Sequence, residues 1–381
     1  MSAQYQVLRA VGLSLLAALL FTSTYVLNRA VAVGGGHWAW TAALRYLFML
    51  PLLLPLMHWQ GGIAPVWRSL RAAPGAWLGW SGVGFVLFYG LLSVAASSGP
   101  AWLVAGSFQM TVVAGMLCAP LLYRDARARI PRTGFAVGVL IVVGVLLMQF
   151  GNAHGALAPS AWLALACVLV SAFAYPLGNR GLLLHLERRG EPLNATQRVF
   201  GMTLASQPAW WALALWAWTQ AGPPPVAQME AIFVVALVSG VAATILFFHA
   251  SGMVRRNPSA LGAVEAMQAS EVVFAALLAV MLLGEPWPHG QALFGGLLVV
   301  AGIALFAWVV AHEAARDQRV AHAVQFVDHP LEFVEQRVRR RRAVGLDHGV
   351  GGDDGLDALR VADGDAVGAD GHERGRRQAR D

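Results

Sequence analysis

Residues 258–287, PSALGAVEAMQASEVVFAALLAVMLLGEPW, decide the fold of this chain. The apolar run is long enough to cross a bilayer as a helix, because a hydrocarbon core of about 30 Å needs about 20 residues. It nevertheless contains Glu265, Gln268 and Glu271. A charged side chain at the centre of a spanning helix costs about 2.5–3.5 kcal/mol on insertion scales, so we expect these acids to face protein or water. An ionisable residue inside a span indicates a substrate or proton site.

The rest of the chain is equally apolar. It is 57% hydrophobic and 13% charged, whereas soluble globular proteins have about 25% charged residues. The sequence therefore predicts an all-α polytopic membrane protein with ten transmembrane helices. The predicted segments lie at about 10–31, 38–58, 75–95, 101–122, 133–150, 160–178, 199–219, 230–252, 259–283 and 289–311.

The basic residues predict the orientation of the chain. The net charge is +6, no lysine occurs, and arginines follow the second, fourth, sixth and eighth segments but not the intervening ones. Because cytoplasmic loops carry the excess of positive charge, we expect both termini to be cytoplasmic. We expect a multi-pass protein of the plasma membrane, the inner membrane of a bacterium. The same pattern accounts for the positive charge without a nucleic-acid partner.

The two halves of the chain repeat each other. Residues 25–29, YVLNR, are echoed by residues 175–180, YPLGNR, and Arg45 in the second segment matches Arg198 in the seventh. Each repeat holds five spans, an odd number, so the two repeats cross the membrane in opposite senses. Inverted repeats of this kind are typical of secondary transporters, whose substrate site lies near the midplane where the repeats meet.

The repeat and a change of composition divide the chain into three parts. The first five-helix repeat is residues 1–155, the second is residues 156–311, and a tail follows at residues 312–381. The end of the tail is built largely from Gly, Asp, Ala, Val and Arg. Such a segment buries too little apolar surface to fold alone, so we expect a disordered cytoplasmic tail.

The ten segments, the five-plus-five repeat and residues 271–285, EVVFAALLAVMLLGE, resemble the EamA-type branch of the drug/metabolite transporter superfamily and its multidrug-resistance efflux members. The most specific feature is an acid or proline before VFAALLA, followed by a closing LGE. The resemblance covers about residues 8–311 and implies export of small metabolites or drugs, driven by proton exchange. Residues 111–120, TVVAGMLCAP, hold the corresponding place in the first half but have no acid and no LGE.

Glu265 and Glu271 are the main candidates for a proton-linked group. Six residues apart on a helix, they point about 120° away from each other, with Gln268 between them. We therefore expect one acid to line a central cavity and the other to meet a neighbouring helix. A carboxyl group in a low dielectric holds its proton more tightly and can release it when a cationic substrate arrives. Arg29 and Arg45 are the expected partners of a structural acid, although either could instead bind a substrate carboxylate.

Further polar and aromatic residues are expected at the same cavity. Gln109 lies in the fourth segment, the counterpart of the ninth, and would face the same cavity. Tyrosine and tryptophan rings could hold a cation over their faces, and asparagine amides could bond backbone carbonyls or substrate. The remaining candidates are Asn28, Asn179, Tyr25, Tyr89, Tyr175 and Trp102.

Motifs for other chemistries are missing from the sequence. Neither GxSxG nor GxxxxGK occurs, which argues against a serine hydrolase and an ATP-driven pump. Cys118 and Cys167 lie inside apolar runs, so we expect neither a disulfide nor a metal site, and no cofactor.

We therefore expect a proton-coupled, alternating-access exporter of a small organic solute, which is a metabolite, an amino acid or a cationic drug. It would act as a monomer or homodimer rather than as an enzyme. The alternative is a membrane-embedded enzyme acting on a lipid-linked substrate. That alternative needs clustered polar residues at one face, whereas His249 and His289 are predicted to lie at opposite faces. A third alternative is a membrane scaffold that does not transport.

Overall fold

A computed structural model of the chain describes the helical region and leaves out the tail. Within the described residues, every regular element is a helix. The predicted disordered tail and Glu265 lie outside them, so both expectations stay predictions. The described residues are 3–124, 128, 132–152, 159–254, 264, 267–305 and 308–309.

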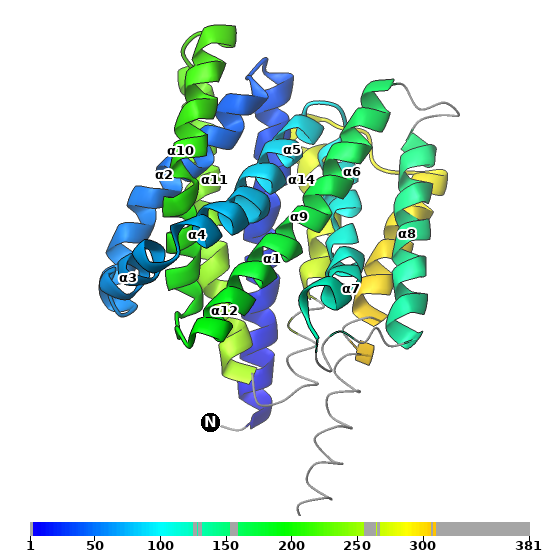
Figure 1. The fold of residues 1–381 in the computed structure, drawn as a ribbon. Coiled ribbons are helices and arrows are strands. Elements are labelled where there is room, and N and C mark those ends of the chain that lie inside the picture. The colour runs from blue at the N-terminus through cyan, green and yellow to red at the C-terminus, as the bar shows by residue number, and fades with distance from the viewer. Residues whose placement is uncertain are drawn as a thin grey trace, which may run out of the picture. The chain divides into compact units, whose positions relative to one another are not determined.

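All ten predicted segments are helical in the part that the structure describes (Figure 1). Five segments are single helices: α1 (Ala3–Val33), α2 (Trp38–Trp59), α8 (Arg132–Asn152), α9 (Pro159–Arg189) and α10 (Ala195–Ala221). The third segment consists of α4 (Pro74–Ser81), η1 (Gly82–Leu87) and α5 (Phe88–Ala96). The fourth consists of α6 (Ala101–Phe108) and α7 (Met110–Leu122). The eighth consists of α11 (Val226–Val235), η3 (Ala236–Ala243) and α12 (Thr244–Val254). The ninth consists of η4 (Met267–Ala269) and α14 (Ser270–Leu283), and the tenth is the helix Gly290–Leu305.

Seven of these helical segments are long and apolar enough to cross a membrane, and two shorter apolar helices accompany them. The two shorter ones are Met267–Leu283 and Gly290–Leu305, the described parts of the ninth and tenth segments. The remaining helix, α10, has 27 residues but is more polar, because Arg198 and several Gln, Thr and Trp residues lower its hydropathy. The prediction of an all-α, multi-pass membrane protein is therefore confirmed.

The first helix of each half of the chain packs mainly against helices of the other half. Helix α1 packs against η3, α12 and α14 of the second half. Helix α9, the predicted counterpart of α1, packs against α4, η1, α5 and α7 of the first half. The second and seventh segments, α2 and α10, pack against each other. The first helix of each half is thus covered by the third and fourth segments of the other half.

Two of the helix crossings depend on glycine. A Cβ atom added to Gly178 of α9 would lie 2.3 Å from the Cα atom of Gly84 in η1. A Cβ atom added to Gly144 of α8 would lie 2.8 Å from the carbonyl oxygen of Gly295 in the tenth segment. The backbones can approach this closely only because the side chains are absent. The second of these crossings holds α8 beside the helix Gly290–Leu305 (Figure 1).

Several interruptions and one helix were not predicted. The π-helical stretches η1 and η3 lie at corresponding places in the third and eighth segments. The fourth and ninth segments also break at corresponding places, at Gln109 and at the 3₁₀ turn η4. In addition, α3 (Ala64–Ala72) occupies a stretch expected to be a loop, where Val66 is buried while Arg68 and Arg71 are exposed.

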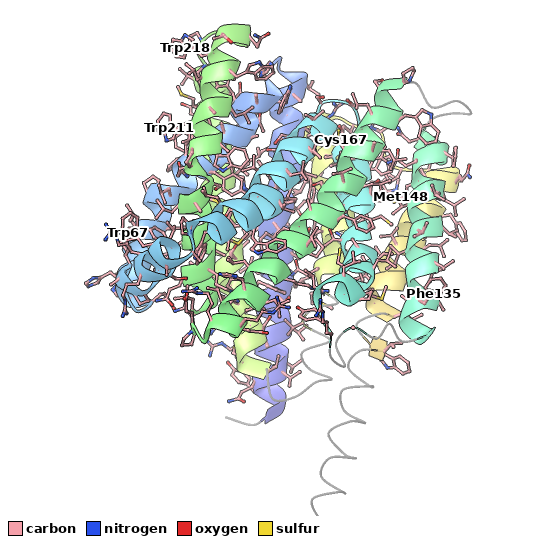
Figure 2. All side chains as sticks on the ribbon, in the orientation of Figure 1. Trp67, Phe135, Met148, Cys167, Trp211 and Trp218 are labelled. Atoms are coloured by element: carbon pink, nitrogen blue, oxygen red, sulfur yellow. The ribbon has the colours of Figure 1, made fainter. Side chains whose placement is uncertain are left out.

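The outer surface of the helices is apolar. Trp211 and Trp218 of α10 and Phe135 of α8 are exposed, and Figure 2 shows them on the outer side of their helices. A soluble monomer rarely exposes contiguous apolar surface of this extent. The surface is therefore suited to contact with lipid.

Candidate functional site

Glu271 is a buried carboxylate in the first turn of α14, directly after the turn η4. Its side chain is 7% exposed, and its Oε2 atom accepts a long hydrogen bond of 3.4 Å from the hydroxyl of Tyr25 in α1. Within the described part of the chain, no basic group lies within ion-pair distance of it. Acids are favoured in the first turn of a helix, which is where Glu271 lies in α14. Glu271 is therefore tolerated without a counter-ion but remains available for one.

Four aromatic side chains from different helices form a continuous set next to Glu271, called here the aromatic cluster: Tyr25, Phe88, Phe108 and Tyr175. The ring of Phe108 lies 6.4 Å from Tyr25, 5.5 Å from Phe88 and 6.3 Å from Tyr175, between ring centroids. Phe88 and Tyr175 are 4.9 Å apart. Tyr175 is nevertheless 40% exposed. The rings are thus packed against one another, while part of Tyr175 stays exposed.

A second cluster surrounds Arg45 of α2, which is 9% exposed. Its Nη1 atom donates to the Thr24 hydroxyl at 2.9 Å and to the Tyr89 hydroxyl at 3.1 Å, and its Nη2 atom donates to the Ser239 hydroxyl at 3.2 Å. The guanidinium carbon lies 4.3 Å from the centroid of the Tyr89 ring. The amide of Asn28 contacts the Tyr89 hydroxyl at 3.0 Å. We call these five residues the arginine cluster.

Helix α1 joins the two clusters. Thr24 and Asn28 are four residues apart and so lie on one face, which meets Arg45 and Tyr89. Tyr25, one position beyond Thr24, turns away toward Glu271. Tyr25 lies close enough to both Glu271 and Arg45 to interact electrostatically with each of them. The same turn of α1 therefore contacts a buried cation through Thr24 and a buried acid through Tyr25.

Arg29 forms an ion pair with Glu285 rather than with Glu271. The Nε atom of Arg29 lies 3.0 Å from Oε1 of Glu285, whose Oε2 atom accepts a hydrogen bond of 3.0 Å from the N–H of Ala101. Ala101 is the first residue of α6, so the carboxylate occupies the positive end of that helix. Gly284 ends α14 in the left-handed conformation, at φ 64°, and places Glu285 there. The closing LGE sequence thus ties α1, α6 and α14 together.

The other predicted residues are more dispersed. Gln109 is buried at the break between α6 and α7, and Gln268 lies in the corresponding break η4. Asn179 donates to the carbonyl oxygen of Tyr175 at 2.8 Å, a bond within α9. Trp102 is buried, and no ring contact with the aromatic cluster is found in the described chain. Glu265 lies outside the described residues.

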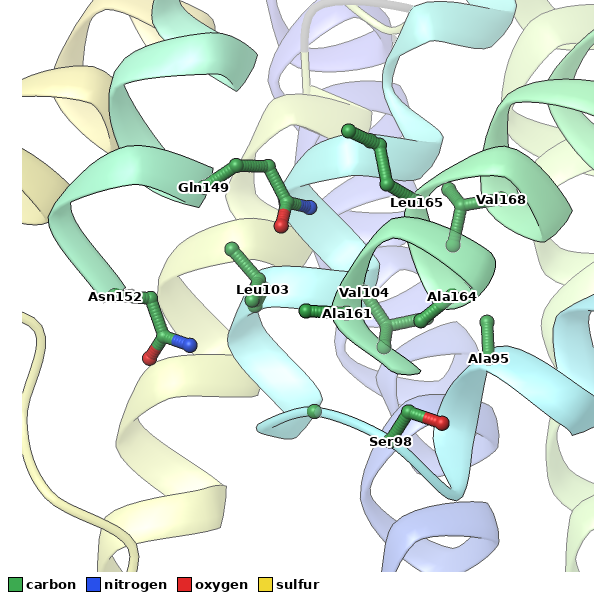
Figure 3. Close-up of a pocket in the computed structure, with 11 residues that line it drawn as sticks. Ala95, Ser98, Leu103, Val104, Gln149, Asn152, Ala161, Ala164, Leu165 and Val168 are labelled. Carbon is green, nitrogen blue, oxygen red and sulfur yellow. The ribbon is translucent and has the colours of Figure 1, made fainter. Parts of the chain in front are cut away.

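A small pocket lies apart from both clusters, between α6, α8 and α9 (Figure 3). Gln149 and Asn152 of α8 and Ser98 supply its polar groups, and Leu103 and Val168 are among its apolar walls. None of the predicted site residues lines it. The pocket therefore does not belong to the candidate site around Glu271 and Arg45.

Several functional candidates were missed by sequence reasoning. Phe88 and Phe108 are members of the aromatic cluster, and Thr24 and Ser239 are members of the arginine cluster. Thr24 had a usable signal, because its spacing of four from Asn28 places both on one helix face. Ser239 had none beyond being a hydroxyl in an apolar run, because its partner Arg45 is far away in the sequence.

The structure also bears on other chemistries. His249 lies in the middle of α12 and His289 directly before the helix Gly290–Leu305, and α14 runs between these two places in the chain. Among the described residues, no group of three or more His, Cys, Asp or Glu could hold a metal ion. The enzyme alternative thus gains no supporting cluster from the part of the chain that the structure describes.

Comparison with known proteins identifies relatives of this sequence. Residues 8–312 match the protein-family model described as "EmrE: Putative multidrug resistance efflux transporter". Uncharacterized protein YjlA of Bacillus subtilis (strain 168) is 41% identical over 307 residues, which cover 78% of this chain and 94% of that protein. An uncharacterized 42.1 kDa protein of Shouchella clausii, from the 3′ region of an intracellular alkaline protease, is 40% identical over 261 residues, covering 67% of this chain and 68% of that protein.

A solved structure among those that match has the same fold. It is described only as "Crystal structure of protein", superposes with a TM-score of 0.53 at 16% identity, and covers 80% of this chain and 98% of its own. At that identity the likeness concerns the arrangement of the helices alone.

Proposed function

Because this chain belongs to the EmrE-type family of multidrug resistance efflux transporters, in the drug/metabolite transporter superfamily, we propose that it is a proton-coupled secondary transporter. In this proposal it exports a small organic solute by alternating access. It lies in a bacterial plasma membrane with ten spans and with both termini in the cytoplasm. The arginines that follow every second span support this orientation.

The packing of each half's first helix against the other half supports alternating access. The first helix of each half is covered by the third and fourth segments of the other. The interruptions are paired as well, with η1 matching η3 and the break at Gln109 matching η4. Interrupted helices at the interface between inverted repeats form the substrate sites of many secondary transporters. Two halves packed in this reciprocal way can rock about a site held between them.

The observation that carries the proposal is Glu271. It is a buried acid within a predicted span, has no basic partner among the described residues, and lies beside an aromatic cluster whose member Tyr175 is partly exposed. A carboxyl group in such a place either holds a proton or needs a cationic group from a ligand. Proton and solute can therefore alternate at this group. The Tyr25 hydroxyl is placed to donate to the carboxylate while the proton is away.

The first prediction concerns Glu271→Gln. Purified protein in proteoliposomes is tested for flux of ethidium and of a panel of radiolabelled amino acids, with and without an imposed pH gradient. We expect wild-type protein to move at least one of these solutes against its gradient when protons flow the other way. In the Glu271→Gln protein we expect gradient-driven accumulation to fall to the level of liposomes without protein, because the amide cannot exchange a proton.

Glu230→Gln is the matched control. Glu230 is an exposed acid on α11, so this substitution makes the same chemical change outside the site. It should transport like wild type. Proton-driven accumulation that survives in Glu271→Gln would remove this residue from the coupling mechanism. Equal leakage from all proteoliposomes, with no dependence on the pH gradient for any solute, would count against a proton-coupled transporter.

A further inference from the structure

We infer that the transported solute carries a carboxylate, bound by Arg45, and that aromatic acids and aromatic amino acids are the solutes that fit this site. The inference rests on the proposed function for its account of transport. It goes further by choosing among the solute classes left open there. It starts from the partners of Arg45.

The arginine cluster leaves a buried charge without a counter-ion. The three groups that accept hydrogen bonds from Arg45 are the hydroxyls of Thr24, Tyr89 and Ser239, all of which are neutral. Its Nε atom has no hydrogen-bond partner. The ion pairs of the described chain are Arg29 with Glu285 and Arg189 with Glu191, so neither involves Arg45. A guanidinium is always charged in proteins, and its planar set of donors matches a carboxylate.

The hydroxyls hold the guanidinium in place rather than neutralise it. The Thr24 hydroxyl also donates to the Ser239 hydroxyl at 2.6 Å, and the Tyr89 hydroxyl is fixed by the amide of Asn28. Tyr89 additionally lies under the guanidinium plane. A cation fixed in this way is preorganised, so a ligand carboxylate would not have to bear the cost of ordering it.

The charge balance of the site favours a carboxylate over a simple cation. Arg45 and Glu271 are the two ionisable charges described at the site. With Glu271 protonated, the site has one excess positive charge, which a monocarboxylate neutralises; such a ligand binds together with the proton, whereas exchange for the proton needs an ammonium group as well. With Glu271 ionised, the two charges balance, and a zwitterion preserves that balance. A cationic solute leaves at least one uncompensated positive charge in both states, and uncompensated buried charge is costly.

The aromatic cluster suggests the remainder of the solute. Its member Tyr25 contacts Glu271 and lies within electrostatic range of Arg45, and its member Tyr175 is 40% exposed. Flat rings pack well against such a surface, at about 0.5–1.5 kcal/mol per aromatic pair beyond area burial. An aromatic amino acid would then place its carboxylate toward Arg45 and its ammonium toward Glu271.

The test uses three probes that share a phenylethyl skeleton and differ in charge: 3-phenylpropionate, phenylalanine and phenethylamine. Each is titrated at constant pH into purified full-length protein in detergent, and thermal unfolding is followed by the fluorescence of its 14 tryptophans. A ligand that binds the folded state raises the midpoint, and the rise grows with the logarithm of ligand concentration once that concentration exceeds Kd. We expect the two carboxylates to raise the midpoint and phenethylamine to have no effect.

Arg45→Gln should weaken both carboxylates by at least about 30-fold, the loss expected when one partner of a buried charge pair is removed. Arg45→Lys keeps the charge but not the planar donors, so it should weaken them less. The control is Arg188→Gln, which alters an exposed arginine at the end of α9 and should change nothing. If Arg45→Gln does not fold, Arg45→Lys decides, and unchanged affinity for both carboxylates overturns the inference.

The inference and the proposed function can fail separately. Stabilisation by carboxylates without proton-driven flux would leave the Arg45 site standing and remove the transport mechanism. Proton-driven flux of a cation, with no stabilisation by either carboxylate, would keep the transporter and overturn the inference. Stabilisation by phenethylamine alone would overturn it as well.

Discussion

Arg29 and Arg45, in the first two spans, differ in whether their charge is paired with an acid. Arg29 has an acid for a partner, Glu285, and also donates to backbone carbonyls at the end of α5. Arg45 is more deeply buried and has only neutral partners. A residue type alone does not separate a structural cation from a ligand-binding one. What separates them is whether the charge is already balanced.

A second prediction concerns the Arg29–Glu285 pair. A double-mutant cycle of Arg29→Gln and Glu285→Gln should give a coupling free energy of about 1–3 kcal/mol, because the side chains are only 21% and 10% exposed and the carboxylate also caps α6. The same cycle on Arg189 and Glu191, whose side chains are 39% and 23% exposed, should give about 0.2–1 kcal/mol. Thermal unfolding of the purified variants measures both. Equal coupling in the two pairs would show that Arg29–Glu285 is an ordinary surface contact.

For individual side chains, the sequence predicted some of the residues of the candidate site but not their partners. Glu271 was found from the cost of an acid in an apolar run, and Arg45 and Tyr89 from their place inside predicted spans. The pairing of Arg29 with Glu285 was missed, because it depends on a left-handed glycine at one helix end meeting the start of another helix far away in the sequence. The placement of the sites that bind substrate and protons stays a prediction.

Among the helices, the positions of the spans followed from hydropathy, but their internal geometry did not. A run of apolar residues has the same pattern whether it forms a continuous helix or one with a wider turn, so η1 and η3 left no signal in composition. The helix α3 was missed because it is short and was judged by its arginines alone. Close crossings such as that of Gly84 with Gly178 depend on two segments at once.

The crossing of α9 over η1 can be tested by Gly178→Ala. The added Cβ would lie 2.3 Å from backbone atoms of Gly84 and 2.8 Å from the carbonyl oxygen of Trp80, and backbone cannot move aside as a flexible side chain can. We expect a loss of about 1–3 kcal/mol of stability, the usual cost of overpacking, seen as a lower midpoint of thermal unfolding. Gly296→Ala is the control, because its Cβ meets nothing within 4 Å and the change raises helix propensity by about 1 kcal/mol. A midpoint for Gly178→Ala at or above that of wild type would show that the two helices can separate without cost.

For the whole molecule, the alternation of arginine-rich and arginine-free loops is the sequence property that sets orientation, and it needs no coordinates. The helices follow the predicted order, and the reciprocal packing of the two halves is the arrangement that five-span repeats in opposite senses would give. Neither property identifies the solute. Solute identity depends on a few side chains at the meeting point of several helices, which sequence spacing cannot bring together.

Orientation can be measured with single cysteines. Cys118 and Cys167 are both buried, so replacing them leaves a background on which new cysteines report. With the cytoplasmic side as predicted, Gln220→Cys at the end of α10 should react with a membrane-impermeant maleimide added to intact cells. Arg188→Cys at the end of α9 should react only after the membrane is opened. The reverse labelling pattern would show that both termini lie outside the cytoplasm. Labelling of both sites in intact cells would show that the spans between them do not alternate as predicted.

The π-helical stretch η1 has a geometric consequence for everything that follows it. Each such turn winds in about one residue more than an α-turn, so tightening it would swivel the rest of the third segment by about 100° about its own axis. Phe88 and Tyr89 come directly after η1 and belong to the aromatic and arginine clusters. A local rewinding would therefore turn both rings away from their clusters at once, and would empty the proposed solute site by rotation of α5 alone.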